Sequence, residues 1–94
     1  MLRITVDDRG PETHLRLEGR LAGPWVTELE NCWRQYSTGV PYRKLVVDLT
    51  GTESVDLAGK YLLTLMHERG ATFTARTLPM KDLVAEIAGA GAQS

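Results

Sequence analysis

The stretch KLVVDLTGTESVDLAG, residues 44–59, decides the fold of this chain. It begins with a nearly continuous apolar run, residues 45–49, which only Asp48 interrupts and which is typical of a strand covered on both faces. Residues 50–55 then predict a loop, and Asp56 is a suitable N-cap for the helix that follows. A buried strand that ends in a polar loop and a helix N-terminus is the place where open α/β sheets carry their functional surface.

Towards the N-terminus, two alternating segments predict a hairpin. Apolar and polar residues alternate over residues 2–7 and again over residues 14–18, as in strands with one buried face. Residues 8–11 have the composition of a turn, so we expect the two strands to be antiparallel. Residues 19–23 are expected to form a loop.

A first helix is predicted between the hairpin and the central strand. It begins at Pro24, which fits the first helical position, and extends to about Tyr36. Residues 37–42 contain a glycine and a proline that end it. The apolar residues that recur at helical spacing are Trp25, Leu29, Cys32, Trp33 and Tyr36.

Two more helices and one more strand are predicted after the central strand. The second helix covers residues 57–68, with an apolar face made of Ala58, Tyr61, Leu62, Leu65 and Met66. Residues 71–76 alternate and predict a fourth strand. Pro79 opens a third helix whose buried side comprises Leu83, Val84, Ile87 and Ala88, and residues 89–94 are expected to be weakly helical at best.

The predicted order is therefore β-β-α-β-α-β-α. Each strand–helix–strand passage is expected to be a right-handed parallel crossover, whereas the hairpin is antiparallel. The sequence thus predicts an α/β fold with a mixed sheet of about four strands covered by helices, in a single domain over residues 1–94.

Composition excludes several classes of function. The net charge of −1 leaves no basic patch for nucleic acid. The single cysteine rules out an internal disulfide and is compatible with a reducing compartment. No apolar run approaches the roughly 20 residues of a membrane span, so no direct membrane insertion is expected. There is no signal-peptide pattern either, and we expect a cytoplasmic protein.

Three stretches together resemble a STAS domain, the sulfate-transporter and anti-sigma-factor-antagonist family. They are LEGRLAG (residues 17–23), the central stretch of residues 44–59, and HERGATFTA (residues 67–75). Family members typically read Gly-x-Leu-Asp after the second strand, then Asp-Leu-Ser/Thr-Gly at the end of an apolar strand, and Asp-Ser-Ser/Thr-Gly at the next helix. The matching residues are Asp48, Gly51, Asp56 and Gly59, while Ala22 and Leu57 depart from the pattern.

The resemblance implies a phosphorylation site, which this chain has lost. In the bacterial anti-sigma factor antagonists, the Ser or Thr before that last glycine is phosphorylated by a kinase that is also the anti-sigma factor. Phosphorylation adds about −1.5 to −2 charges to the contact surface and releases the partner. Ala58 occupies this position and has no hydroxyl. The resemblance therefore implies a degenerate phosphosite and a constitutive binding module, with phosphorylation of the nearby Thr50, Thr52 or Ser54 as the open alternative.

We predict that the partner-binding surface comprises the loops at residues 19–23 and 50–55 and the start of the second helix. Its residues are Arg20, Ala22, Asp48, Ser54, Asp56, Leu57, Ala58, Gly59 and Lys60. Asp56 has a compatible structural role as helix cap, and Asp48 either accepts hydrogen bonds from the N–H groups of Gly51 or Thr52 or contacts the partner. Lys60 opposes the helix dipole, which is tolerated if it faces solvent or favourable if it meets an acidic partner.

For the remaining tryptophan and cysteine side chains, packing in the core is the default expectation. Trp25 either packs in the core or anchors a partner. Cys32 is expected to be a small core residue, since nothing in the spacing brings His14 or His67 close to it. The chain has no zinc-ligand spacing and no phosphate-binding glycine loop, so no cofactor and no enzymatic activity are predicted.

The leading hypothesis is a non-enzymatic bacterial regulator of transcription that binds a protein, resembling an anti-sigma factor antagonist. Its expected partner is an anti-sigma factor that is also a serine kinase. The alternative is a STAS subunit that docks on the ATPase of a membrane lipid-transport complex, a role that needs no phosphoacceptor. An enzyme or nucleotide-binding domain is a third hypothesis with little support in the sequence, and homodimer formation stays open.

Overall fold

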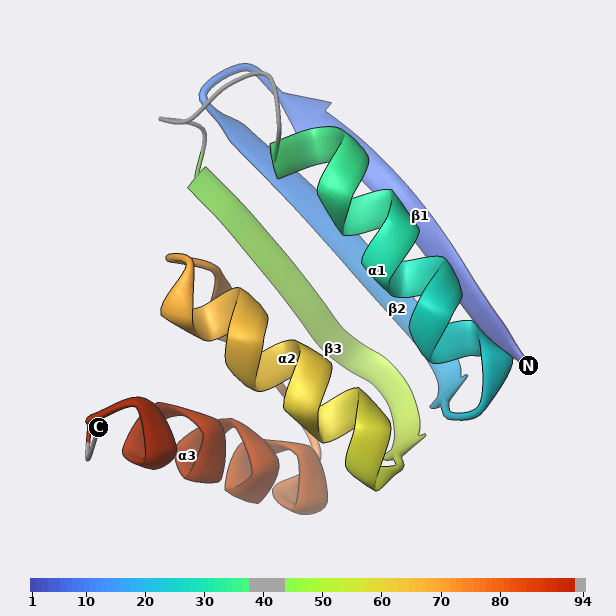
Figure 1. The fold of residues 1–94 in the computed structure, drawn as a ribbon, viewed down its shortest axis with the longest axis vertical. Helices are drawn as coiled ribbons and strands as arrows, with labels where there is room; N and C mark the ends of the chain where they lie inside the picture. Colours follow the sequence, from blue (N-terminus) through green and yellow to red (C-terminus); the bar gives the residue numbers. More distant parts are fainter. Residues whose placement is uncertain (38–43, 93–94) are drawn as a thin grey trace.

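The structure is a computed structural model that describes residues 1–37 and 44–92 of the 94. Its elements follow the predicted order β-β-α-β-α-β-α (Figure 1). They are β1 (Leu2–Arg9), β2 (Glu12–Leu21), α1 (Pro24–Ser37), β3 (Lys44–Val55), α2 (Leu57–Glu68), β4 (Thr72–Thr74) and α3 (Leu78–Ala92). The predicted end of the first helix at residues 37–42 falls mostly outside the described residues.

The four strands form one mixed sheet in the order β1-β2-β3-β4. β1 and β2 are antiparallel, and β3 is parallel to both β2 and β4. The predicted hairpin and the predicted mixed sheet of four strands are therefore confirmed.

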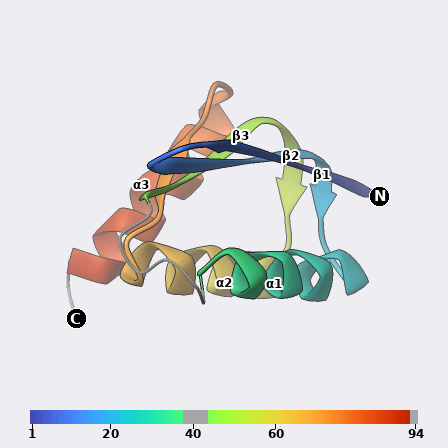
Figure 2. The ribbon, with the colours of Figure 1, turned by 90° about the horizontal axis from the view of Figure 1, so that it is seen from above.

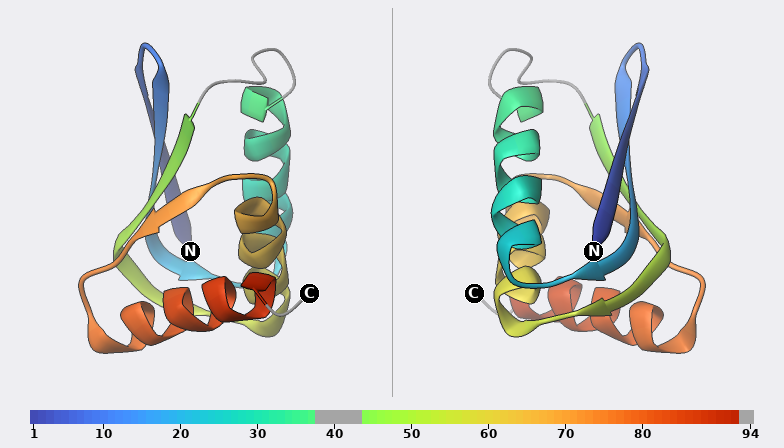
Figure 3. Two further views of the ribbon diagram at one scale, coloured as in Figure 1. Left: turned by 90° about the vertical axis from the view of Figure 1, so that its left-hand side faces the viewer. Right: turned by 90° about the vertical axis from the view of Figure 1, so that its right-hand side faces the viewer.

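The helices cover one face of this sheet. α1 and α2 run side by side in a layer against that face (Figure 2), and α3 lies beside α2 (Figure 1) and also contacts β4. The opposite, outer face carries exposed polar side chains from all four strands, among them Arg3, Thr5, Arg16, Thr50 and Thr72. Figure 3 shows the sheet and the helices from two sides.

The prediction that the central strand is covered on both faces was wrong: Val47 and Leu49 are fully buried, but Asp48 lies on the outer face.

The core lies between the helix layer and the sheet. It joins side chains from both hairpin strands, from β3 and from all three helices, of which the largest fully buried ones are Leu15, Leu17, Leu21, Leu29, Val47, Leu49, Leu63, Met66 and Ile87. In the part of the chain that the structure describes, no helix is both long and apolar enough to span a membrane.

β2 and β3 are longer than predicted. Residues 19–21 and 50–55 were expected in loops, but they continue the two strands, and Gly19, Arg20 and Leu21 pair with Thr52, Ser54 and Val55. The pairing is interrupted by two shifts of register, as at β-bulges, and both strands curve towards the helix layer at this end (Figure 2). Thr52 shows why the strand continues: its side chain is buried, and its hydroxyl donates to the carbonyl of Leu17 at 2.8 Å.

α2 turns a different side to the core from the predicted one. Its buried residues are Gly59, Leu62, Leu63 and Met66. Ala58 and Tyr61 are exposed, and Leu65 is 38% exposed. The wrong face was predicted because apolar residues occur all round this helix, so their spacing does not fix one side.

The last two elements also differ in detail from the prediction. β4 has three residues, whereas six were predicted. In α3, Met80 and Ile87 are buried, while Ala88 is exposed. The helix continues through Gly89 to Ala92, although residues 89–94 were expected to be weakly helical.

Candidate functional site

Four chain segments meet at the end of the sheet where β2 and β3 finish and where α1 and α2 begin (Figure 2). Asp56, between β3 and α2, connects them. Its backbone N–H donates to the carbonyl of Leu21 at the end of β2, at 3.1 Å. Its carboxylate accepts from the N–H of Gly59 in α2 at 2.7 Å and from the N–H of Gly23, just before α1, at 3.0 Å.

One carboxylate therefore caps α2 and also holds the loop that leads into α1. The hydrogen bonds from Gly59 and then from Gly23 hold the pKa of Asp56 below its usual value. Asp56 is thus an anion at neutral pH, placed where the dipole of α2 is positive. The predicted N-cap role of Asp56 is confirmed.

Gly59 allows α2 to approach the sheet closely at this point. A Cβ atom on Gly59 would lie 2.9 Å from Val55 Cγ1 and 3.0 Å from both the Cγ and the carbonyl oxygen of Leu21. Such distances are shorter than normal van der Waals contacts, so a side chain here would push the helix start away from β2 and β3. Gly59 is consequently buried beneath the surface that Asp56 and its neighbours form.

Five other residues of the predicted surface lie around Asp56. Arg20 and Ser54 are exposed and pair across the parallel strands β2 and β3. Ala22 is half-buried in the short connection to α1. Leu57 and Ala58 are exposed in the first turn of α2, and Leu57 has 68% of its surface exposed. We call these five residues together with Asp56 the α2-start surface.

Asp48 does not belong to this surface. It precedes Asp56 by eight residues of strand, which corresponds to roughly 25 Å of extended chain, and it lies on the outer face. Its carboxylate accepts from the N–H of Thr50 at 2.9 Å and lies 3.5 Å from Arg16 Nε. The structural role predicted for Asp48 therefore involves the N–H of Thr50 and not that of Gly51 or Thr52. Partial burial raises the pKa of Asp48, but the contacts with Thr50 and Arg16 outweigh it and lower the pKa overall.

Lys60 also has a structural partner within the domain. Its Nζ lies 2.9 Å from Oε2 of Glu86, so it connects α2 to α3. The acidic partner that the sequence left open for Lys60 is thus found inside the same chain. Because Lys60 is directed towards α3, we leave it out of the α2-start surface.

The sequence interpretation missed two residues of this region, Tyr61 and Leu65. They follow Leu57 at intervals of four residues, so the three side chains form one stripe along α2, with Tyr61 70% exposed. Both were assigned to the buried face, while Leu63, which is fully buried, was left out of it. The signal available in the sequence was the presence of apolar residues on every side of the helix, which indicates contacts beyond the core.

The other residues considered in the sequence contact the core or neighbouring side chains. Trp25 and Cys32 are half-buried and pack against the core, and burial raises the pKa of the Cys32 thiol. His14 contacts Glu12, and the His67 ring packs near Phe73. Among the described residues, no three metal-ligating side chains are grouped so that they could hold an ion.

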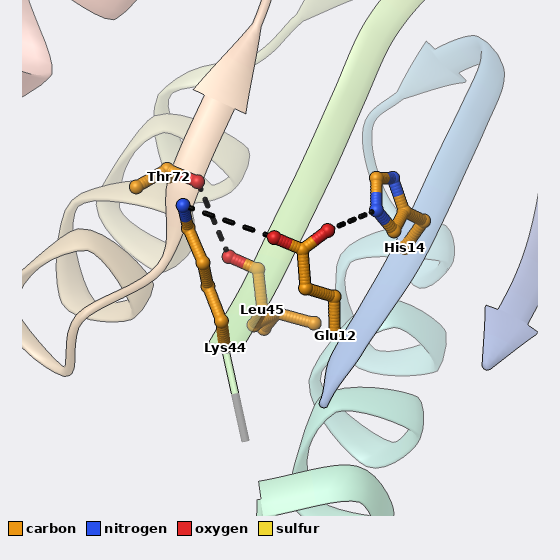
Figure 4. Close-up of polar contacts among 5 residues, drawn as sticks. All are labelled: Glu12, His14, Lys44, Leu45 and Thr72. Atoms are coloured by element: carbon orange, nitrogen blue, oxygen red, sulfur yellow. Dashed lines mark hydrogen bonds and ion pairs between the residues drawn. The ribbon is translucent and has the colours of Figure 1, made fainter. Parts of the chain in front are cut away.

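The outer face carries a second set of polar contacts, away from the α2-start surface. Near the beginning of β3, the carboxylate of Glu12 lies 3.2 Å from His14 Nε2 and 3.9 Å from Lys44 Nζ (Figure 4). Beside them, the Thr72 hydroxyl donates to the carbonyl of Leu45 at 3.5 Å. A shallow hollow of about 260 Å³ on this face is lined by Thr5, Val6, Asp7, His14, Arg16 and Asp48.

The fold, but not the sequence, is similar to known proteins. No protein-family model matches the chain, and no curated protein matches it. A solved structure of the protein Mglu is similar over 78% of this chain, with a TM-score of 0.61 and 18% sequence identity. This chain spans only 19% of Mglu.

An uncharacterised protein from Shewanella loihica PV-4, which has a SpoIIAA-like fold, is similar over 84% of this chain and 71% of its own length. The TM-score is 0.58 and the identity is 12%. At such identities the likeness concerns the fold alone. The chain has a SpoIIAA-like α/β fold, which supports the STAS-like architecture expected from the sequence.

Proposed function

We propose that this chain is a non-enzymatic regulatory module that binds a protein partner through the α2-start surface. The observation that carries the proposal is the convergence of β2, β3, α1 and α2 around Asp56, with exposed Leu57 and Ala58 beside it. An apolar centre with a polar rim is the usual composition of a protein-binding patch. Arg20 and Ser54 supply the rim here.

Ala58 removes one way of regulating the binding of the partner, namely phosphorylation at this position. Ala58 is exposed in the first turn of α2, next to Leu57, and its methyl group offers no site for a phosphate. Partner binding would therefore not be released by phosphorylation at this position. The partner class that fits the STAS-like fold is an anti-sigma factor that is also a serine kinase.

The test is a charge introduced into the α2-start surface next to Leu57. Ala58→Glu places a carboxylate in the first turn of α2, where the helix dipole favours it, so the fold should be retained. The matched control is Ala85→Glu, which makes the same change at an exposed position of α3. Circular dichroism of both variants checks the fold.

Binding is measured by pull-down from a bacterial lysate, with soluble and membrane fractions kept apart, followed by calorimetric titration of the captured partner. We expect Ala58→Glu to weaken binding at least tenfold and Ala85→Glu to leave it unchanged, because a charge in an apolar patch is left unpaired when the partner covers it. Equal binding by a folded Ala58→Glu variant would refute the proposed surface. Capture of a transporter ATPase in the membrane fraction would keep the surface and replace the partner class.

A further inference from the structure

β1 forms one edge of the sheet, and no strand among residues 1–37 and 44–92 pairs with the edge that faces away from β2. The strand order places it beyond β2, and Figure 1 shows no described element beyond it. Open edges present unpaired N–H and C=O groups, to which another strand can bind. Residues at such an edge therefore either prevent or direct pairing with a second chain.

The hydrogen-bond pattern shows which backbone groups point outwards. The N–H of Arg20 donates to the carbonyl of Met1 at 3.1 Å, and the register of β1 and β2 continues from there without a shift. In an antiparallel pair, hydrogen-bonded and non-hydrogen-bonded pairs alternate. The odd-numbered residues of β1 therefore bond to β2, and the outward N–H and C=O groups belong to Leu2, Ile4, Val6 and Asp8.

An independent contact supports this assignment. Leu17 is the partner of Ile4 in the β1–β2 register, and the same alternation predicts that its carbonyl points away from β1. That carbonyl accepts the hydroxyl of Thr52 in β3 at 2.8 Å, as expected.

The sequence of β1 is self-complementary when a second copy is added in antiparallel orientation. The outward N–H and C=O groups of one copy must bond to those of the other copy. If the two-fold axis passes through Thr5, Ile4 lies opposite Val6 of the second copy and Leu2 lies opposite Asp8. On the outer face, the same register places Arg3 opposite Asp7 twice, and Thr5 opposite Thr5. Opposite charges and paired threonines are both favourable cross-strand neighbours.

Neighbouring registers lack this complementarity. Centring on Ile4 places Arg3 opposite Thr5, and centring on Val6 places Asp7 opposite Thr5, so neither joins opposite charges. The inner face favours pairing as well: Ile4 and Val6 are only half-buried, whereas their cross-strand partners on β2 are fully buried. A second copy of β1 would cover the exposed parts of both side chains.

We propose that the outer edge of β1 is a dimerisation edge, at which two copies of this chain pair antiparallel around Thr5 and join their sheets into one of eight strands. The interface is a single strand from each copy, which is small compared with standard protein interfaces. We therefore expect a reversible dimer whose mass approaches twice 10.4 kDa as concentration rises.

The first test is Thr5→Glu, which places two carboxylates opposite each other on the two-fold axis. Within one copy, Thr5 is exposed and lies beside Arg16 in the register, so the monomer should tolerate the new charge. The control is Thr27→Glu on the exposed side of α1. Sedimentation should show a dissociation constant raised more than tenfold by Thr5→Glu and unchanged by Thr27→Glu, since like charges that face each other are strongly unfavourable.

The second test exchanges the charges. Arg3→Asp and Asp7→Arg should each abolish the dimer, because each places like charges opposite one another. The double variant should restore it. A contribution of these residues to the monomer alone would not be rescued in this way, since their cross-strand neighbours Glu18 and His14 are unchanged.

Hydrogen exchange locates the edge directly. The amides of Ile4 and Val6 should become protected as concentration rises, while those of Thr5 and Asp7 should be protected throughout by β2. A protein that stays monomeric at every concentration up to about 1 mM would overturn the proposal, because a dissociation constant larger than about 1 mM means negligible association. A dimer that persists in Thr5→Glu, or one that leaves the exchange of Ile4 and Val6 unchanged, would overturn it too.

Discussion

Gly59→Ala tests the close approach of α2 to the sheet, on which the α2-start surface depends. The new methyl group would meet Val55 and Leu21 at 2.9–3.0 Å. Rotation of the Leu21 side chain would not remove the contact, because the backbone carbonyl of Leu21 is also 3.0 Å away and accepts the N–H of Asp56. The first turn of α2 must therefore move outwards, which stretches the hydrogen bonds that Asp56 makes.

Two opposing effects decide how much Gly59→Ala changes the free energy of unfolding. Overpacking of this kind costs about 1–3 kcal/mol, whereas replacing a helical glycine by alanine gains about 1 kcal/mol. We expect Gly59→Ala to destabilise the domain by about 1 kcal/mol. For 94 residues the entropy of unfolding is about 0.2 kcal/mol/K, so the melting temperature should fall by about 5 °C.

Gly89→Ala is the matched control, because Gly89 is also helical but a methyl group added to it would meet no atom within 4 Å outside its own helix backbone. Only the propensity gain applies there, and the melting temperature should rise by about 3–5 °C. Thermal unfolding followed by circular dichroism measures both variants. The difference between them isolates the overpacking cost, and a Gly59→Ala variant as stable as Gly89→Ala would refute the close approach.

Two further predictions concern the observed helix face and the outer sheet face. Leu63→Ala should lower the free energy of unfolding by about 2–5 kcal/mol, while Leu57→Ala should change it by less than about 0.5 kcal/mol, as measured by urea unfolding. Similar losses would contradict the assigned face of α2. The pKa of Asp48 is lowered in the folded state, so its stabilising effect is present above the unfolded pKa and is lost as pH falls through the folded pKa. Asp48→Asn should therefore be less stable than wild type at neutral pH and approach it in acid; an equal difference at both pH values would contradict this.

Element order and type followed from the sequence because apolar spacing and capping residues act locally. Pro24 starts α1, and Asp56 precedes α2, as their chemistry requires. The length of β3 did not follow, because the segment after Leu49 is rich in residues that also favour turns. Its conformation is decided by pairing with β2, and the buried hydroxyl of Thr52 makes that pairing favourable.

The composition of the candidate site was predicted only in part for the same reason. Once β3 was taken to end at Leu49, Asp48 was expected close to the helix start, whereas the observed strand separates it from Asp56. The ion pair of Lys60 with Glu86 was not predicted, because Glu86 is distant in sequence and no local pattern indicated their contact. The position of Asp48 relative to α2 was thus predicted wrongly because it depends on the length of β3, whereas the cap role of Asp56 was predicted correctly because it is local.

The two proposed surfaces occupy different parts of the domain, which gives them a joint consequence. Pairing through β1 uses backbone groups at the edge of the sheet and leaves Leu57 and Ala58 exposed on α2. Because the two β1 strands would be antiparallel, the two α2-start surfaces would lie towards opposite ends of the joined sheet. Each copy would then bind its own partner molecule, and the complex would contain two copies of each protein. Thr5→Glu should halve the mass of that complex without changing the affinity of the α2-start surface, since the two surfaces share no residue.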